Sequence, residues 1–292
     1  MSGVLSDKFD FPPLSILDAT SKRWQLRKQE WLARGISSEI GRDQNLLRLS
    51  DTIRKGGNGT SVFDPVLAEL AYKWFAKPKG QVIDPFAGGS VRGVVAGWRG
   101  LLYWGCDLSE RQIEENRKQA EEIRRNHPHE FREMPIWVVG DSIDKLDGAP
   151  DADFLFSCPP YGHLEVYSDD ARDLSNMDAE KFLLAYRAII VKSVSKLRDN
   201  SFACFVVGDY RDKHGYLSNL YGETVHAFKK AGAHFYNNMI LRTPIGSAAI
   251  RAAGAFTNKK ATTVHQHVLV FCKGDPQKVT EKNTTLTVVE QA

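Results

Sequence analysis

The chain has 292 residues, 42% hydrophobic and 26% charged, which suggests one large domain, or one domain with a small appendage. No run approaches the roughly 18 apolar residues of a membrane helix, and the N-terminus lacks the basic-then-apolar layout of a secretion signal. The net charge of +3 is too small to indicate nucleic acid by itself, and the four cysteines lack metal-ligand or redox-pair spacing, so we expect a reduced, cytoplasmic protein.

The first 59 residues stand apart from the rest of the chain. They mix Pro, Ser, Arg and Trp, and basic and aromatic side chains interleave between Lys22 and Trp31. They show no alternation of strand and helix patterns. We therefore treat 1–59 as an N-terminal extension and a candidate substrate- or DNA-contacting segment.

Between residues 60 and 275, short apolar runs alternate with amphipathic patterns, which predicts one domain with a parallel sheet and helices on both faces. The first predicted helix is Pro65–Phe75, with Asp64 as its cap and Pro65 at its first position. The strand candidates, of which the first five alternate little, as strands buried on both faces should, are 81–83, 101–106, 136–139, 153–157, 202–207, 235–241 and 265–271. The other predicted helices are 109–124, 177–197 and 216–230.

Two further segments lie outside this alternation. Residues 243–264 form a Gly- and Ala-rich, basic insertion between the last two strands, and 276–292 form a polar tail. No acidic residue lies between Glu223 and Asp275, a stretch that contains Arg251 and Lys259 among its cations. This distribution fits either an ordinary surface or a basic face on which Arg251 and Lys259 bind a polyanion.

The strongest local motif is VIDPFAGGSVRG at 82–93, where a strand ends at Asp84, a glycine turn follows and a helix begins near Ser90. Glycines allow close backbone approach to a ligand, and open α/β sheets bind ligands at the carboxyl ends of their strands. The motif has neither the Gly-Lys-Ser/Thr of a phosphate loop nor the three spaced glycines of a dinucleotide site. It therefore predicts a ligand that is less phosphate-like.

Two more carboxylates follow strand ends. Asp107 ends LLYWGCD, at about the distance where nucleotide-binding folds place a carboxylate on ribose hydroxyls, and Asp141 ends WVVGD. Acidic residues at strand ends often serve only to cap the next helix or turn. Their recurrence after three successive strands favours a binding site.

A second motif, Cys158-Pro159-Pro160-Tyr161, follows the apolar strand at 153–157. Proline lacks an N–H and pushes the preceding residue into an extended conformation. The motif therefore presents a stiff backbone with carbonyl acceptors, which suits an exocyclic amino group as a hydrogen-bond donor, with Tyr161 stacked on the base. The alternative is a rigid loop without function.

Both motifs resemble those of nucleic-acid amino-methyltransferases that use S-adenosyl-L-methionine. DPFAGGS at 84–90 is similar to their glycine-containing motif, and SCPPYG at 157–162 is similar to their catalytic motif of Asp, Asn or Ser, then Pro-Pro and an aromatic residue. FDPVLAEL at 63–70 resembles the helix that closes over the methionine part of the cofactor. The resemblance spans residues 60–273.

The resemblance implies a Rossmann-like α/β fold with a seven-stranded, mostly parallel sheet, a reversed C-terminal hairpin and S-adenosyl-L-methionine as cofactor. It places Asp84 near the methionine amino group, Asp107 on the ribose and Asp141 near the adenine. The cofactor-binding residues it implies are Phe63, Pro65, Asp84, Pro85, Phe86, Ala87, Gly88, Gly89, Ser90, Asp107, Leu108, Asp141 and Ser142. The catalytic residues it implies are Ser157, Cys158, Pro159, Pro160 and Tyr161.

Cys158 departs from the family pattern, because a thiol is a poor hydrogen-bond acceptor. Either the Pro159 carbonyl and Ser157 take over that role, or Cys158 is a nucleophile, as in cytosine-C5 methyltransferases. Those enzymes place Pro before Cys, the reverse of the order here. We therefore expect amino methylation, at adenine N6 or cytosine N4, ahead of pyrimidine C5 methylation.

The sequence leaves three functions open: a DNA base methyltransferase of bacterial or bacteriophage type, which we favour, an RNA base methyltransferase, and an inactive cofactor-binding subunit. Recognition falls to 1–59, to 243–264 or to a partner, because little chain follows the last strand. The acidic loop after the second motif is either a solvated surface loop or a lid in which Glu165 and Tyr167 contact an extruded base. We expect no metal and no membrane partner.

Overall fold

The computed structural model describes residues 9–37, 63–161, 170, 172–212, 214–246 and 248–282, with the side chains of 280–282 excepted. Glu165 and Tyr167, which we expected to contact the substrate, lie outside these described residues. Within the described ranges, no helix is both long and apolar enough to cross a membrane, and no cluster of side chains has the composition of a metal site.

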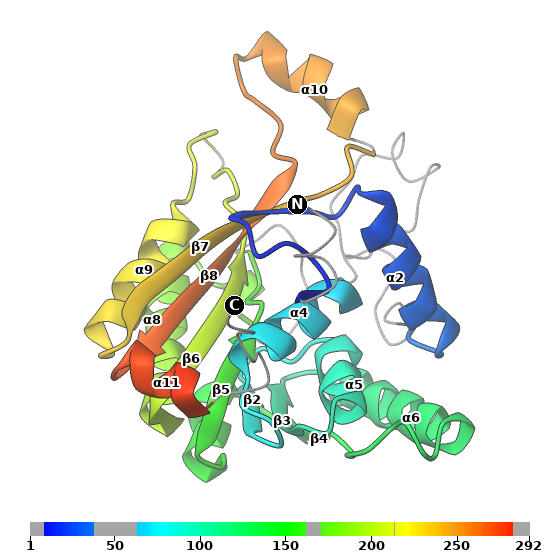
Figure 1. The fold of residues 1–292 in the computed structure, drawn as a ribbon. Helices are drawn as coiled ribbons and strands as arrows, with labels where there is room; N and C mark the ends of the chain where they lie inside the picture. The colour runs from blue at the N-terminus through cyan, green and yellow to red at the C-terminus, as the bar shows by residue number, and fades with distance from the viewer. Residues whose placement is uncertain are drawn as a thin grey trace, which may run out of the picture.

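The fold is built on one eight-stranded sheet with the order β1-β7-β8-β6-β5-β2-β3-β4 (Figure 1). Every pairing is parallel except those of β8, which runs antiparallel to both β6 and β7. The predicted α/β class, with a mostly parallel sheet and a reversed C-terminal hairpin, is confirmed. The predicted number of seven strands is wrong, because residues 16–18 of the N-terminal segment add an eighth strand beside β7. The strands are β1 (Ile16–Asp18), β2 (Gln81–Asp84), β3 (Leu102–Asp107), β4 (Ile136–Val139), β5 (Ala152–Ser157), β6 (Leu197–Val207), β7 (His234–Arg242) and β8 (His265–Lys273).

Helices cover both faces of the sheet (Figure 1). Side chains of α2, α4, α5 and α6 join one hydrophobic core, and those of α8 and α9 join the core on the opposite face. The α-helices are α2 (Lys22–Ala33), α4 (Pro65–Phe75), α5 (Val91–Trp98), α6 (Glu110–Asn126), α7 (Ser142–Lys145), α8 (Ala179–Lys196), α9 (Leu220–Lys230), α10 (Ala248–Thr257) and α11 (Pro276–Lys282), and the short 3-10 turns are η1 (Leu146–Gly148) and η3 (Leu174–Asn176).

The starts of three predicted helices are explained by their capping residues. The side chains of Asp64, Ser109 and Asp178 accept hydrogen bonds from the backbone N–H groups of Val66, Gln112 and Lys181. Each bond satisfies one of the donors that a helix leaves unpaired at its first turn. Helix α4 begins and ends at the predicted residues, and α9 begins four residues later than predicted.

The N-terminal residues 9–37 pack against the sheet domain. Strand β1 extends the sheet by pairing with β7, and α2 lies against α4. Trp24 and Trp31 of α2 are 0% and 1% exposed, and the indole N–H of Trp31 donates to Glu69 of α4 at 2.9 Å. Trp24 and Trp31 are therefore core residues. Of the basic residues beside them, Lys22 and Arg23 are exposed, whereas Arg27 pairs with the buried Glu69 and the guanidinium carbon of Arg34 lies 4.6 Å from the centre of the Trp31 ring.

Residues 243–264 form an arm that carries α10 and joins β7 to β8. Figure 1 shows this helix projecting from the body of the molecule, beyond the carboxyl end of β7. Its side chains are largely exposed: Ile250 is 78% and Phe256 is 61% accessible. We call residues 243–264 the α10 arm.

Candidate functional site

A cavity of about 540 Å³ opens at the carboxyl ends of the parallel strands. That end of an open α/β sheet is where strand-following loops diverge and leave space for a ligand. The sequence predicted a part of this lining. The predicted site residues that line it are Phe63, Pro85, Phe86, Gly88, Asp107, Leu108, Asp141, Ser142, Cys158, Pro159, Pro160 and Tyr161.

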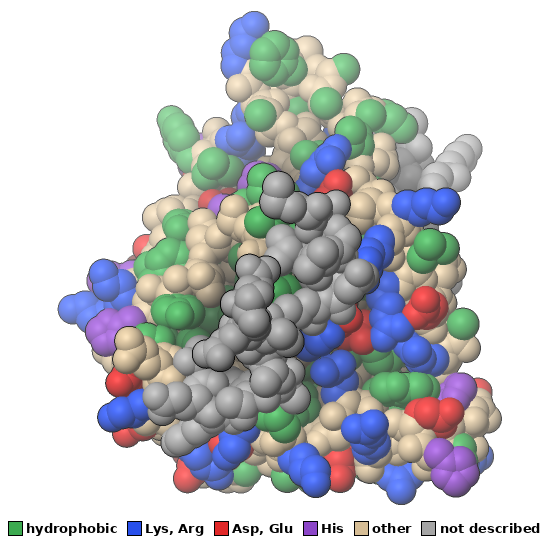
Figure 2. All heavy atoms as spheres, in the orientation of Figure 1, with side chains coloured by type: hydrophobic (Ala, Val, Ile, Leu, Met, Phe, Trp, Pro, Cys, Tyr) green, Lys and Arg blue, Asp and Glu red, His purple; other side chains and the backbone are tan. Residues whose placement is uncertain are grey.

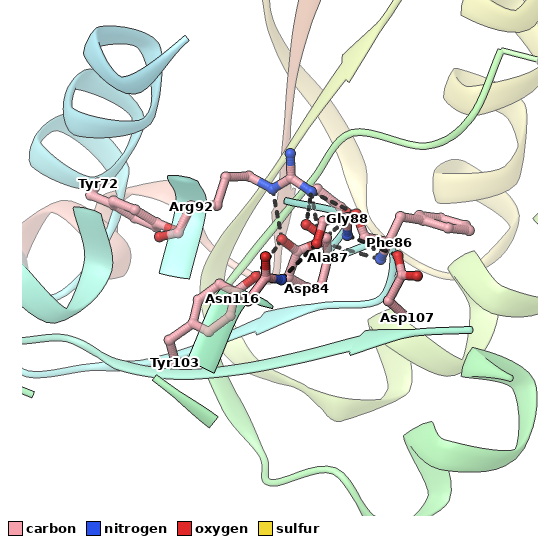
Figure 3. Close-up of polar contacts among 10 residues, drawn as sticks. Tyr72, Asp84, Phe86, Ala87, Gly88, Arg92, Tyr103, Asp107 and Asn116 are labelled. Atoms are coloured by element: carbon pink, nitrogen blue, oxygen red, sulfur yellow. Dashed lines mark hydrogen bonds and ion pairs between the residues drawn. The ribbon is translucent and has the colours of Figure 1, made fainter. Parts of the chain in front are cut away.

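The glycine turn after β2 is held in place by side chains from two neighbouring elements. Gly88 has φ +50, a conformation that side-chain-bearing residues rarely adopt. Its N–H donates to Oδ2 of Asp107 at 2.9 Å, and its carbonyl accepts from Asn116 of α6 at 2.7 Å (Figure 3). The turn is thus fixed in a shape that keeps its backbone against the cavity.

Asp107 and Asp141 both cap the chain that follows them and also line the cavity. Asp107 accepts from the N–H of Ser109 at 2.9 Å, and Asp141 from the N–H of Ile143 at 2.8 Å. The capping role and the ligand-facing role are therefore compatible, because a carboxylate has about four lone-pair sites. Ser142 is buried and donates to the carbonyl of Pro85, which joins the two loops.

Asp84 and Ser157 do not line the cavity, although the family resemblance placed one at the cofactor and the other in catalysis. Both are 0% exposed. The carboxylate of Asp84 accepts from Tyr103 at 2.7 Å, from Ser157 at 2.5 Å and from Nε of Arg92 at 2.6 Å. These donors turn Asp84 inward, so in this arrangement it supports the glycine turn from beneath.

Arg92, in the first turn of α5, was not among the sequence-predicted residues, yet it lines the cavity. Nη2 donates to the carbonyls of Phe86 at 2.6 Å and Ala87 at 3.1 Å (Figure 3). Burial opposes its charge, but the neighbouring Asp84 carboxylate raises the pKa of Arg92 above its ordinary value. A buried carboxylate such as Asp84 needs a counter-charge. An arginine eight residues after Asp84 was therefore the sequence signal that could have identified Arg92 as a site residue.

The second motif also lines the cavity, and it follows β5, the strand that pairs with β2. Sγ of Cys158 lies 3.4 Å from Oη of Tyr161, which accepts a hydrogen bond from Gln266 of β8 at 2.7 Å. The sequence around Cys158 lacks a cation, but the fold brings Arg92 close enough for its charge to interact with the thiol. Gln266 is a second lining residue that sequence reasoning did not identify.

The N-terminal part of the chain also contributes to the lining. Ala19, Lys28, Asp64 and Leu67 line the cavity beside Phe63, and Nζ of Lys28 lies 3.2 Å from the Asp64 carboxylate. Of the other predicted cofactor residues, Pro65, Ala87, Gly89 and Ser90 are not part of the lining. Pro65 is buried in α4, Ala87 is buried beneath the turn, and the Ser90 hydroxyl donates to Gln119.

The two predicted substrate-binding cations lie on the α10 arm, away from the cavity lining. Arg251 and Lys259 are exposed, and Figure 2 shows hydrophobic and basic side chains gathered on this projecting part of the molecule. The arm begins at the cavity, because Thr243 and Pro244 line it. The arm therefore connects the cavity to a surface outside it.

The chain matches no protein-family model and no curated protein. Among solved structures it is similar to TrmN from Thermus thermophilus, with 16% identity and a TM-score of 0.46 over 72% of this chain and 49% of that one. It is also similar to a TehB-like SAM-dependent methyltransferase from Corynebacterium glutamicum, with 15% identity and a TM-score of 0.44 over 74% of this chain and 90% of that one. A third similar structure is magnesium protoporphyrin IX methyltransferase from Synechocystis PCC 6803 with bound SAM, with 10% identity and a TM-score of 0.42 over 74% of this chain and 86% of that one. The chain spans about half the length of TrmN, and likenesses this distant extend no further than the fold.

Proposed function

We propose that this chain is an S-adenosylmethionine-dependent methyltransferase that modifies a base in DNA, at an exocyclic amino group of adenine or cytosine. One observation carries the proposal. A single cavity is lined both by the strand-end carboxylates Asp107 and Asp141 and by Cys158-Pro159-Pro160-Tyr161. A cofactor site and an acceptor site that share one space are what a group transfer requires.

The lining residues fit S-adenosylmethionine. Asp107 would accept hydrogen bonds from the ribose hydroxyls, and Leu108, Asp141 and Ser142, which line the same cavity, would contact the adenine. The volume of about 540 Å³ lies within the range of roughly 300–1,000 Å³ common for small-molecule sites. When bound, this cofactor supplies a methyl group already activated on a sulfonium sulfur.

With an activated donor, the chain has only to hold the acceptor in position. Pro159 and Pro160 contribute no backbone donors, so this edge of the cavity offers carbonyl oxygens to an amino group. Tyr161 also lines the cavity, and its hydroxyl accepts a hydrogen bond from Gln266 at 2.7 Å; its aromatic ring would stack on a base. Hydrogen bonds from the amino group to such acceptors would keep its lone pair available for methylation.

The α10 arm supports DNA as the substrate. It carries Arg251 and Lys259 in a stretch without acidic residues, and it leads directly from the cavity to the surface. Phosphate contacts by exposed cations supply most of the non-specific affinity for DNA. A base in a duplex must be extruded before an enzyme can act on it, and the exposed Ile250 and Phe256 are apolar side chains suited to the vacated space.

A second reaction, methylation at pyrimidine C5, is favoured by the placement of Cys158. Its thiol lines the cavity in which a base would bind, as a nucleophile that attacks C6 of a pyrimidine must. An RNA base remains the alternative substrate.

Methyl transfer to defined substrates tests the proposal. The full chain is incubated with labelled S-adenosylmethionine and either duplex DNA or tRNA, and the products are digested to nucleosides for mass spectrometry. We expect label in DNA as N6-methyladenine or N4-methylcytosine. Label at cytosine C5 would support the second reaction, label in tRNA alone would contradict the DNA assignment, and no label in either would contradict the enzyme assignment.

A further inference from the structure

Arg92 is a buried arginine of the cavity lining, and one of its terminal nitrogens makes no hydrogen bond among the described residues. The Arg92 side chain is 5% exposed, and its guanidinium is held on two sides. Nε donates to Asp84 at 2.6 Å, and Nη2 donates to the carbonyls of Phe86 and Ala87. Nη1 has no hydrogen bond among the described residues, and Figure 3 shows it pointing away from this network.

The position of this nitrogen is fixed before any ligand arrives. The guanidinium carbon lies 4.6 Å from the centre of the Phe63 ring, which lines the same cavity. Stacking on an aromatic ring and bonds to three acceptors leave the planar group little freedom. A donor held in advance loses little conformational entropy when it binds, so Nη1 has the properties of a ligand-binding group.

We propose that Nη1 of Arg92 binds the carboxylate at the amino-acid end of the cofactor. This inference rests on the proposed function, which supplies the cofactor. Guanidinium groups match carboxylate geometry, and Asp107 and Asp141 suit the hydroxyl-bearing nucleoside end of the same molecule. The cavity then has a nucleoside end at Asp107 and a carboxylate end at Arg92, with Cys158 close to Arg92.

This assignment changes the roles of two residues. Asp84 does not contact the methionine amino group, and instead holds Arg92 in place from beneath. The rivals for the carboxylate are the other cations of the lining. These are Arg111, Arg172, which pairs with Asp170, and Lys28, whose Nζ is 3.2 Å from the Asp64 carboxylate. A purely structural role for Arg92, bracing the glycine turn through Phe86 and Ala87, is the other alternative.

Calorimetry with two ligands distinguishes these roles. S-adenosylhomocysteine is compared with its decarboxylated form, which lacks only the carboxylate, on the full chain and on Arg92→Lys. Lysine keeps a charge for Asp84 but has no second terminal nitrogen. We expect the wild type to prefer S-adenosylhomocysteine by at least about 10-fold, equal to about 1.4 kcal/mol, and Arg92→Lys to lose that preference.

Two variants serve as controls. Arg99→Lys makes the same change at the far end of α5, outside the cavity lining, and should keep the preference. Lys28→Met should keep it too. The inference is overturned if Arg92→Lys weakens both ligands equally or keeps the preference, or if Lys28→Met removes it.

The proposed function and this inference fail in different ways. If the wild type binds neither ligand, the cofactor assignment fails, whereas equal binding of both ligands refutes only the carboxylate subsite. If Arg92→Lys does not fold, a crystal structure of the wild type with S-adenosylhomocysteine decides the matter. A carboxylate oxygen within about 3.2 Å of Nη1 is the expected result, and a carboxylate at Lys28 or at the glycine turn would refute it.

Discussion

The role of the Cys158 side chain distinguishes amino methylation from pyrimidine C5 methylation. Its Sγ is 3.4 Å from the Tyr161 hydroxyl, and it borders the same cavity as Asp107. If the thiol only shapes an amino-group site, Cys158→Ser should retain or raise methyl transfer, because a hydroxyl accepts hydrogen bonds better than a thiol. The rate of label transfer to DNA, at matched protein concentration and folding, measures this.

The nucleophile hypothesis predicts the opposite for the same variant. A serine hydroxyl is a far weaker nucleophile at neutral pH, so Cys158→Ser would be inactive. DNA containing a fluorinated pyrimidine provides an independent readout, because an adduct between Cys158 and C6 would be trapped covalently. An inactive variant together with a trapped wild-type adduct would overturn amino methylation.

Asp107 and Asp84 illustrate which site residues the sequence predicts. Parallel strands end at one edge of a sheet, so a carboxylate directly after a strand is placed there by the backbone, as Asp107 and Asp141 are. The direction of a side chain depends on its neighbours in space. Asp84 turns inward because Tyr103, Ser157 and Arg92 converge on it.

Burial has also fixed the protonation of the groups beneath the glycine turn. Burial raises the pKa of Tyr103 well above its ordinary value, and the Asp84 carboxylate raises it further. The phenol therefore stays protonated at neutral pH and remains a donor to Asp84. Arg92, whose pKa is raised chiefly by Asp84 against the opposing effect of burial, stays charged.

At the scale of elements, the cations of the α10 arm should affect how strongly DNA binding depends on salt. If Arg251 and Lys259 contact phosphates, replacing either by alanine should weaken DNA binding and reduce the slope of log K against log salt by about one. Each contact releases condensed counterions, so losing it flattens the slope. Fluorescence anisotropy with labelled duplex DNA at several salt concentrations measures both quantities.

A matched control separates the arm from general surface charge. Lys118 of α6 is exposed, and its partner Glu115 lies at 2.8 Å, so Lys118→Ala removes one positive charge outside the arm. This variant should keep the wild-type slope. Equal slopes for all the variants would assign Arg251 and Lys259 to ordinary surface.

The predicted strands have a strong local hydrophobic pattern, whereas β1 and α2 have a weak one. Residues 154–157 of β5 and 202–207 of β6 are largely apolar, buried runs, which periodicity identifies, whereas the exposed Arg198 and Asp199 near the start of β6 carry no such signal. Strand β1 has three residues and forms only by pairing with β7, a long-range contact without local signal. Helix α2 was missed although Trp24 and Trp31 are seven residues apart, the spacing of one helical face.

At the scale of the whole molecule, α2 is part of the domain core, and its removal should affect the entire fold. Trp31→Ala empties a site that is 1% exposed and takes a donor from the buried Glu69. We expect a loss of about 3–5 kcal/mol in the free energy of unfolding, typical of large-to-small core changes. Urea denaturation followed by circular dichroism measures it.

Leu26→Ala in the same helix is the control, because Leu26 is 56% exposed. Surface changes of this kind usually stay within about 0.5 kcal/mol. A separate early transition for the N-terminal segment in the wild type, or equal effects of Trp31→Ala and Leu26→Ala, would contradict its membership in the core.

The central claim is that the cavity at the strand ends is a cofactor site. The most direct test is calorimetric titration of S-adenosylhomocysteine into the wild type and into Asp107→Ala. A hydrogen bond with a charged partner contributes about 1.5–3 kcal/mol, so the variant should bind about 10- to 100-fold more weakly. Asp144→Ala, which changes an exposed carboxylate outside the lining, should bind as the wild type does. A folded wild type that does not bind, or equal affinities for wild type and Asp107→Ala, would contradict the account.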